Sequence, residues 1–122
     1  MKKILFIEDE SALQRAVGGA LGQAGYTVLS ALNGKVGLEL AKKELPDLIL
    51  LDLILPEKDG FAVLEELKKD PATGRIPVIV MSNLEGSEDI QRALERGATT
   101  YLVKMNYKLE EVVQKIKQVL VE

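Results

Sequence analysis

The sequence contains no cysteine and no histidine, and these two absences exclude several kinds of chemistry. Without cysteine the chain can form no disulfide, thiol nucleophile or zinc–thiolate site. Without histidine it lacks the usual general base, the usual transition-metal ligand and any Ser-His-Asp triad. Side-chain ligands for a metal would therefore be oxygen atoms, which favour a hard ion such as Mg2+.

Long hydrophobic runs and a strong charge imbalance are also missing. No window approaches the length of a transmembrane helix. The N-terminal stretch "MKKILFIEDE" has only four apolar residues after its lysines, too few for a signal peptide. The net charge of −3 is mild and argues neither for nucleic acid nor for an anionic membrane as the main partner. We predict a cytoplasmic protein with no direct nucleic-acid or membrane partner.

The chain does contain a regular alternation of strand-like and helix-like segments over its 122 residues, 47% of which are hydrophobic. The strand-length apolar runs are Ile4–Ile7, Val28–Leu29, Leu48–Leu51, Val78–Met81 and Tyr101–Val103. Helix-period stripes that include Leu13, Val36, Phe61, Ile90 and Leu109 lie between or after them. Strict alternation indicates βαβ units and a parallel sheet. We predict one α/β domain over residues 1–122, with the less apolar second strand at an edge of the sheet.

Glycines and short polar residues predict where the helices begin and end. Gly25 and Gly97 are expected just past helix ends, and Asn33, Asp59 and Ser87 are expected N-caps. The cluster "VGGALGQAG" does not match a dinucleotide-binding fingerprint and falls inside a helix. We interpret Gly18, Gly19 and Gly22 as residues that allow a helix to approach the sheet closely.

Polar residues follow four of the five predicted strands. Glu8, Asp9 and Glu10 follow the first, Asp52 the third, Ser82 and Asn83 end the fourth, and Lys104 follows the fifth. The carboxyl ends of parallel strands meet at one edge of the sheet, where α/β proteins bind ligands. Crowded carboxylates repel one another unless a cation intervenes. The pattern therefore predicts a Mg2+ site around Asp52.

Each of these residues also has a simpler interpretation. Asp52 could cap a strand end, Ser82 could be a turn former, and Lys104 could be an ordinary surface lysine. Tyr101 could simply fill a half-buried strand position. The recurrence of such residues at four strand ends favours a shared site.

Together these segments resemble the receiver domain of two-component response regulators. The resemblance rests on "IEDE" after the first strand, "LLDLILPEKDG" around Asp52, "VMSN" after the fourth strand and "YLVK" at the fifth. It covers essentially the whole chain. It implies a flavodoxin-like sandwich with strand order 2-1-3-4-5 and five flanking helices.

The resemblance also implies a role for each site residue. Asp52 would be the phosphoacceptor, and Lys104 and Ser82 would contact the phosphoryl group. Glu8, Asp9, Asp52 and the backbone carbonyl of Ile54 would hold Mg2+, while Tyr101 would act with Ser82 as a switch. The protein would catalyse only its own phosphorylation and dephosphorylation, so it would not otherwise be an enzyme.

The partners implied by the resemblance are a sensor histidine kinase or phosphotransfer protein and a downstream protein. The downstream protein would bind Glu85 to Arg96, Tyr101 and Asn106 to Lys117; homodimerisation on phosphorylation is left open. Met105 stands where receivers usually carry proline, so a trans peptide bond is expected after Lys104. That departure alone favours the alternative, a phosphorylation-independent interaction module. A free-standing receiver and a fragment of a longer regulator are equally compatible with the sequence.

Overall fold

The computed structural model describes residues 2–120, in which strands and helices alternate. The strands are β1 (Lys3–Ile7), β2 (Thr27–Ala31), β3 (Leu48–Leu51), β4 (Val78–Ser82) and β5 (Thr100–Val103). The helices are α1 (Ser11–Gln23), α2 (Gly34–Glu44), α3 (Gly60–Lys69), α4 (Ser87–Glu95) and α5 (Leu109–Leu120), with a 3-10 turn η1 (Lys104–Asn106) after β5. The predicted alternation is confirmed. The extension of one domain to all of residues 1–122 includes positions outside the described range and stays a prediction.

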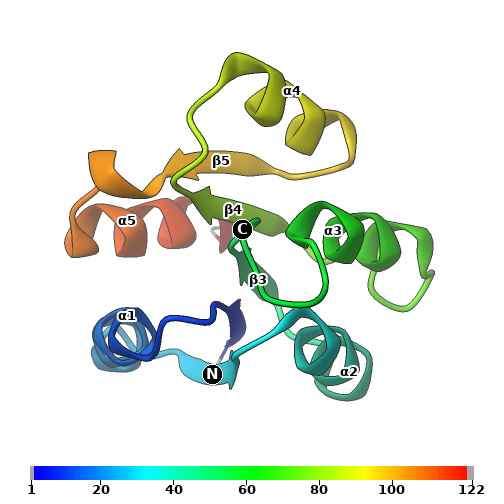
Figure 1. The fold of residues 1–122 in the computed structure, drawn as a ribbon. Coiled ribbons are helices and arrows are strands. Elements are labelled where there is room, and N and C mark those ends of the chain that lie inside the picture. The colour runs from blue at the N-terminus through cyan, green and yellow to red at the C-terminus, as the bar shows by residue number, and fades with distance from the viewer. Residues whose placement is uncertain (1, 121–122) are drawn as a thin grey trace.

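The five strands form one parallel sheet in the order β2-β1-β3-β4-β5. Figure 1 shows three layers, with α1 and α5 on one face of the sheet and α2, α3 and α4 on the other. The predicted fold class and the edge position of the second strand are confirmed. Because β2 lies on one side of β1 and β3 on the other, the strand order reverses between β1 and β3, where such folds bind ligands.

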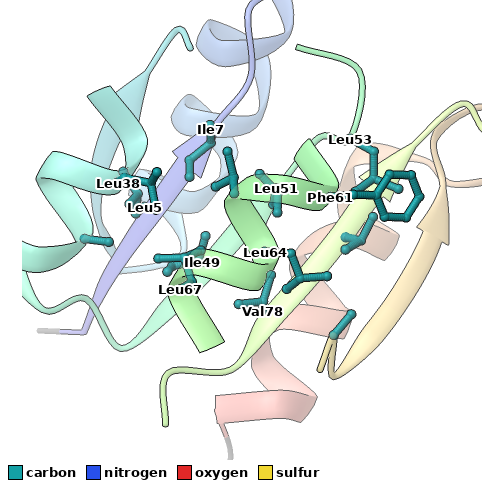
Figure 2. Packing of buried hydrophobic residues seen from close by; sticks show 14 of the residues in the cluster. Leu5, Ile7, Leu38, Ile49, Leu51, Leu53, Phe61, Leu64, Leu67 and Val78 are labelled. Carbon is teal, nitrogen blue, oxygen red and sulfur yellow. The ribbon is translucent and has the colours of Figure 1, made fainter. Parts of the chain in front are cut away.

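Two apolar clusters hold the layers together. Every residue of β3 and β4 is buried, as expected for central strands that are covered on both faces. Figure 2 shows the cluster between the sheet and α2 and α3, which includes Leu5, Ile7, Leu38, Ile49, Leu51, Phe61, Leu64, Leu67 and Val78. The opposite cluster packs α1 and α5 on the sheet and includes Phe6, Val17, Leu21, Leu50 and Ile116. This two-sided burial makes the strand ends a rigid platform for the loops that follow them.

The helix boundaries agree with the sequence at four of five predicted positions. Oδ1 of Asn33 accepts a hydrogen bond from the Val36 amide at 2.9 Å, and Oδ1 of Asp59 accepts one from the Phe61 amide at 3.0 Å. Gly25 and Gly97 follow helix ends with φ of 98° and 107°, in the left-handed region that glycine favours. Ser87 was expected as an N-cap and is instead the first residue of α4. Gly86 occupies the cap position, which glycine tolerates almost as well.

The interpretation of the α1 glycines is wrong. No atom lies within 4 Å of a Cβ built on Gly19 or Gly22, and at Gly18 the nearest is an ordinary contact with Val28 at 3.9 Å. The close approach instead occurs at Gly37, against Ile7, and at Gly60, against the backbone that follows β3. Gly19 and Gly22 are exposed, away from the face of α1 that buries Val17 and Leu21. None of the helices in residues 2–120 is both long and apolar enough to cross a membrane.

Candidate functional site

The register of the sheet brings the predicted acidic residues together. Ile7 pairs with Leu51, and the Asp52 amide donates to the Ile7 carbonyl at 3.0 Å, so Glu8 and Asp52 leave adjacent strands side by side. Glu8, Asp9 and Asp52 each offer a carboxylate oxygen within 4.8 Å of the others. Glu8 and Asp52 are buried and Asp9 is exposed. The strand ends thus build an acidic cluster that solvent reaches from the Asp9 side.

Lys104 links the two buried carboxylates of this cluster. Its Nζ lies 2.6 Å from Oε1 of Glu8 and 3.1 Å from Oδ2 of Asp52. The three side chains are only 15%, 1% and 5% exposed, respectively. Oε1 of Glu8 is buried and finds no other donor among residues 2–120. The lysine ammonium is therefore the cation that balances two desolvated carboxylates in this arrangement.

The pKa values of Glu8 and Lys104 reflect this balance. Burial raises the pKa of Glu8, although the Lys104 ammonium and the Glu10 amide act in the opposite direction. Burial alone would lower the pKa of Lys104, but the adjacent Glu8 and Asp52 carboxylates outweigh it and the pKa is raised. Lys104 is accordingly protonated at neutral pH and remains a fixed positive charge in the site.

The cluster lines an open hollow of about 250 Å³. Its lining residues are Glu8, Asp9, Glu10, Asp52, Ile54, Asn83 and Lys104. The ligand atoms are oxygens, which suit a hard divalent cation such as Mg2+ or Mn2+. The donor set present therefore fits the predicted metal, with Glu8, Asp9 and Asp52 as the acidic ligands.

Ser82 and Tyr101 lie beside this hollow and are joined through Leu84. The Leu84 amide donates to Oγ of Ser82 at 3.4 Å, and the Tyr101 hydroxyl donates to the Leu84 carbonyl at 2.6 Å. Ser82 is fully buried and Tyr101 is half-buried, and burial raises the pKa of the Tyr101 phenol. One residue of the β4–α4 loop therefore contacts both predicted switch residues.

Met105 does not displace Lys104 from the site. No cis peptide bond occurs in residues 2–120, so the bond after Lys104 is trans, as expected. Met105 lies in η1, and its side chain is 71% exposed. The Lys104 side chain remains directed at Glu8 and Asp52. The departure from the usual proline thus leaves the lysine contact intact.

Two residues that support the site were not predicted from the sequence. Gln14 is buried on α1, where its side-chain amide contacts the end of β1, and Gly60 packs against the backbone of Asp52 and Leu53. Gln14 could have been noticed, because it shares one helix face with the buried Val17 and Leu21 and is the polar residue on that face. Gly60 gave no such signal, because it is the first residue of a helix whose expected N-cap is Asp59, and that cap alone accounts for the segment.

Fold and site define a parallel α/β domain with an acidic, oxygen-rich hollow and a paired lysine at the carboxyl edge of its sheet. The sequence model described as the response regulator receiver domain matches residues 4–117. The chain belongs to this family, and so is a receiver domain of a two-component response regulator.

Its curated relatives are longer proteins. The chain is 40% identical over 102 residues to response regulator PleD of Caulobacter vibrioides, which covers 84% of the chain and 22% of PleD. It is 38% identical over 120 residues to the DNA-binding dual master transcriptional regulator RpaA of Synechocystis, which covers 98% of the chain and 49% of RpaA. The chain therefore spans between about a fifth and about half of these relatives.

Solved structures of similar length share the whole fold. The Mn(2+)-bound form of response regulator Rcp1 superposes with a TM-score of 0.87 at 32% identity, over 100% of this chain and 96% of Rcp1. Chemotaxis protein CheY4 of Vibrio cholerae superposes with a TM-score of 0.91 at 28% identity, over 98% of this chain and 99% of CheY4.

Proposed function

We propose that the chain is a phosphoryl-accepting signalling switch in which Asp52 is the phosphoacceptor. The single observation that carries this proposal is the Lys104 ammonium held between Glu8 and Asp52, with Asp9 at the open side of the same cluster. A carboxylate nucleophile needs a fixed orientation and nearby positive charge when a phosphoryl group arrives. Asp52 has both, because its Oδ1 accepts from the Ile54 amide at 3.2 Å and its Oδ2 contacts Lys104.

The residues of the site would divide the reaction between them. One oxygen of Asp52 would attack the phosphorus atom in line with the bond that joins it to a nitrogen of the phosphoryl donor. That bond would break, and its electron pair would remain on the donor nitrogen. Lys104 would neutralise charge on the phosphoryl oxygens as a point charge. Glu8, Asp9, Asp52 and the Ile54 carbonyl would hold Mg2+, which when bound supplies charge neutralisation to the same oxygens. Ser82 would donate its hydroxyl to the phosphoryl group.

The phosphoryl donor would be a sensor histidine kinase or a phosphotransfer protein, because this chain has no histidine of its own. Exposed apolar side chains at the carboxyl edge support docking of a protein rather than of a small molecule alone. Ile54 and Met105 are 54% and 71% exposed and lie in the loops that follow β3 and β5. The site is thus an acidic hollow with an apolar border. The cytoplasmic location of the chain and its phosphoryl donor stays a prediction.

The signal would travel through Leu84. A phosphoryl group adds about two negative charges and strong acceptor oxygens. If the Ser82 hydroxyl turns toward it, Oγ no longer accepts from the Leu84 amide, and the loop whose carbonyl binds Tyr101 is released. The surface formed by Glu85 to Arg96, Tyr101 and Asn106 to Lys117 would then change shape and bind a downstream protein or a second copy of the chain. This change is a shift in the equilibrium between two conformations of the chain. Its size is set by the difference in the affinity of the partner for the two conformations.

The test of the proposed function is Asp52→Asn treated with acetyl phosphate and Mg2+. The unmodified chain should gain the mass of one phosphoryl group and the variant none, since the amide is not a nucleophile here. Asp59→Asn is the matched control, because Asp59 is exposed and asparagine keeps its role as N-cap of α3. Equal labelling of all three proteins would contradict Asp52 as the phosphoacceptor, and labelling of none would favour the phosphorylation-independent interaction module.

Replacing Tyr101 by alanine should uncouple the switch from the site. The Tyr101 hydroxyl binds the Leu84 carbonyl and makes no hydrogen bond to Asp52 among residues 2–120, so labelling by acetyl phosphate should be unchanged. Without the hydroxyl on the Leu84 carbonyl, the amide chemical-shift changes that beryllofluoride causes in α4 should fall several-fold. Tyr26→Ala, beside the far edge strand β2, should leave those changes intact. If the response of α4 were as large in Tyr101→Ala as in the unmodified chain, the path through Leu84 would be wrong.

A further inference from the structure

Gln14 is a buried polar side chain that donates to the backbone at the ends of two strands. Its Nε2 lies 2.9 Å from the Phe6 carbonyl and 3.1 Å from the carbonyls of Glu8 and Ala31. The side-chain amide has two N–H donors, so at least one of them is shared between two of these three acceptors. The residue is 6% exposed, and its own oxygen has no hydrogen-bond partner within residues 2–120.

These three carbonyls define where the acidic loop leaves the sheet. Phe6 and Ala31 belong to β1 and β2, and the Ala31 carbonyl also accepts from the Glu8 amide at 2.9 Å. The Glu8 carbonyl is part of the peptide plane that joins Glu8 to Asp9. A rotation of that plane would redirect both side chains, and these are two of the three carboxylates of the site. Gln14 therefore contacts the metal site through the backbone and touches none of its ligand atoms.

We propose that Gln14 is a positioning residue for the divalent-cation site. Its side-chain amide holds the Glu8–Asp9 peptide so that both carboxylates face Asp52. The inference rests on the proposed function, because it concerns the same site. Groups that orient metal ligands without touching the metal typically contribute roughly 10- to 100-fold in metal affinity. Glu8 also depends on this support, since its Oε2 accepts from the Glu10 amide at 3.1 Å within the same loop.

A purely structural role would predict a different balance of effects. Replacing Gln14 by methionine keeps the length of the side chain and removes both the donor and the unpaired oxygen. Loss of the donor removes one hydrogen bond from each of the three carbonyls, of which Ala31 keeps the bond from the Glu8 amide, whereas loss of the buried unpaired oxygen is favourable. Loss of the donor lowers the stability and loss of the unpaired oxygen raises it, so the two effects on stability oppose each other. Only loss of the donor affects the orientation of the Glu8–Glu10 loop. Metal affinity should therefore change by more than stability does.

The experiment measures the Mg2+ dissociation constant by titration of the amide signals of the Glu8–Glu10 loop, together with urea unfolding. Gln14→Met should weaken Mg2+ binding roughly tenfold or more, within the range found for such supporting groups. Gln14→Asn retains an amide that is one methylene too short to reach all three carbonyls, so it should show a smaller loss. Gln23→Met is the matched control, because Gln23 is exposed at the end of the same helix, and it should bind Mg2+ as the unmodified chain does.

The outcomes separate this inference from the function on which it depends. If both Gln14 variants bound Mg2+ with the dissociation constant of the unmodified chain, Gln14 would be a structural residue only and the inference would be overturned. If Gln14→Met did not fold, Gln14→Asn alone would decide, with weaker binding in support and unchanged binding against. If the unmodified chain and Gln23→Met showed no Mg2+ binding either, the metal site itself would be wrong and the inference would fail with it.

Discussion

Replacing Lys104 by methionine should lower the free energy of unfolding by about 3–5 kcal/mol at pH 7 in the absence of divalent cations. Removal of one partner from a buried ion pair leaves an uncompensated charge, and this penalty exceeds the net stabilisation that the intact pair supplies. Here two carboxylates are left, because Nζ of Lys104 contacts both Glu8 and Asp52. Methionine retains most of the aliphatic stem, so the loss reports the charge rather than packing.

The same substitution should have a characteristic pH dependence. A carboxyl group whose pKa is raised on folding binds a proton more tightly in the folded state, so its contribution to stability falls as pH rises above the unfolded value. Glu8 is such a group, because burial raises its pKa from the ordinary value of 4.5. Loss of the Lys104 charge would raise this pKa further. The difference between variant and unmodified chain should therefore be small near pH 4.5 and should grow as the pH rises to 7.

Urea unfolding with a chelator and with Mg2+ tests both expectations. Without the competing ammonium, Mg2+ should stabilise Lys104→Met more than the unmodified chain, since a ligand stabilises the state that binds it. Lys58→Met is the control: Lys58 forms a surface pair with Glu66 at 2.6 Å, and such pairs contribute less than about 1 kcal/mol. Equal losses at Lys104 and Lys58 would contradict the description of the Lys104 pair as a buried one.

Replacing Gly60 by alanine should impair both the fold and the site. A Cβ at Gly60 would lie 2.6 Å from the Asp52 carbonyl oxygen and in contact with Leu53 Cα, and both of these are backbone atoms that cannot rotate away. Overpacking of this kind costs about 1–3 kcal/mol. Because the displaced peptide carries Asp52, acetyl phosphate labelling should also slow by roughly 10- to 100-fold, as expected when a reacting group moves by about 1 Å.

Gly19→Ala is the matched control for Gly60→Ala. Gly19 is exposed in the middle of α1 with no atom within 4 Å of a built Cβ. Alanine there should raise the free energy of unfolding by about 0.5–1 kcal/mol, because glycine is the poorer helix former. Thermal unfolding and labelling rates measure both variants. If Gly60→Ala were as well tolerated as Gly19→Ala, the close approach of α3 to Asp52 would matter neither for stability nor for the labelling of Asp52.

The sequence was sufficient to determine the architecture and to predict which strand-end residues would lie together. Apolar runs of strand length with helix-period stripes between them specify βαβ units, because only a parallel sheet covered on both faces buries both patterns. Residues that directly follow such strands must share one edge of the sheet, which is why Glu8, Asp9, Asp52 and Lys104 could be grouped before any distance was known. Both inferences depend only on the period of the pattern and on its position along the chain.

Close contacts between residues distant in the sequence were decided by the tertiary structure alone. Gly60 shows this, because no sequence pattern indicates that it contacts the backbone of Asp52. Gln14 and the bridge from Ser82 through Leu84 to Tyr101 also join segments whose separation only the folded chain determines. Periodicity places a residue on an element, but a hydrogen bond or a steric contact depends on how two elements meet to within fractions of an ångström.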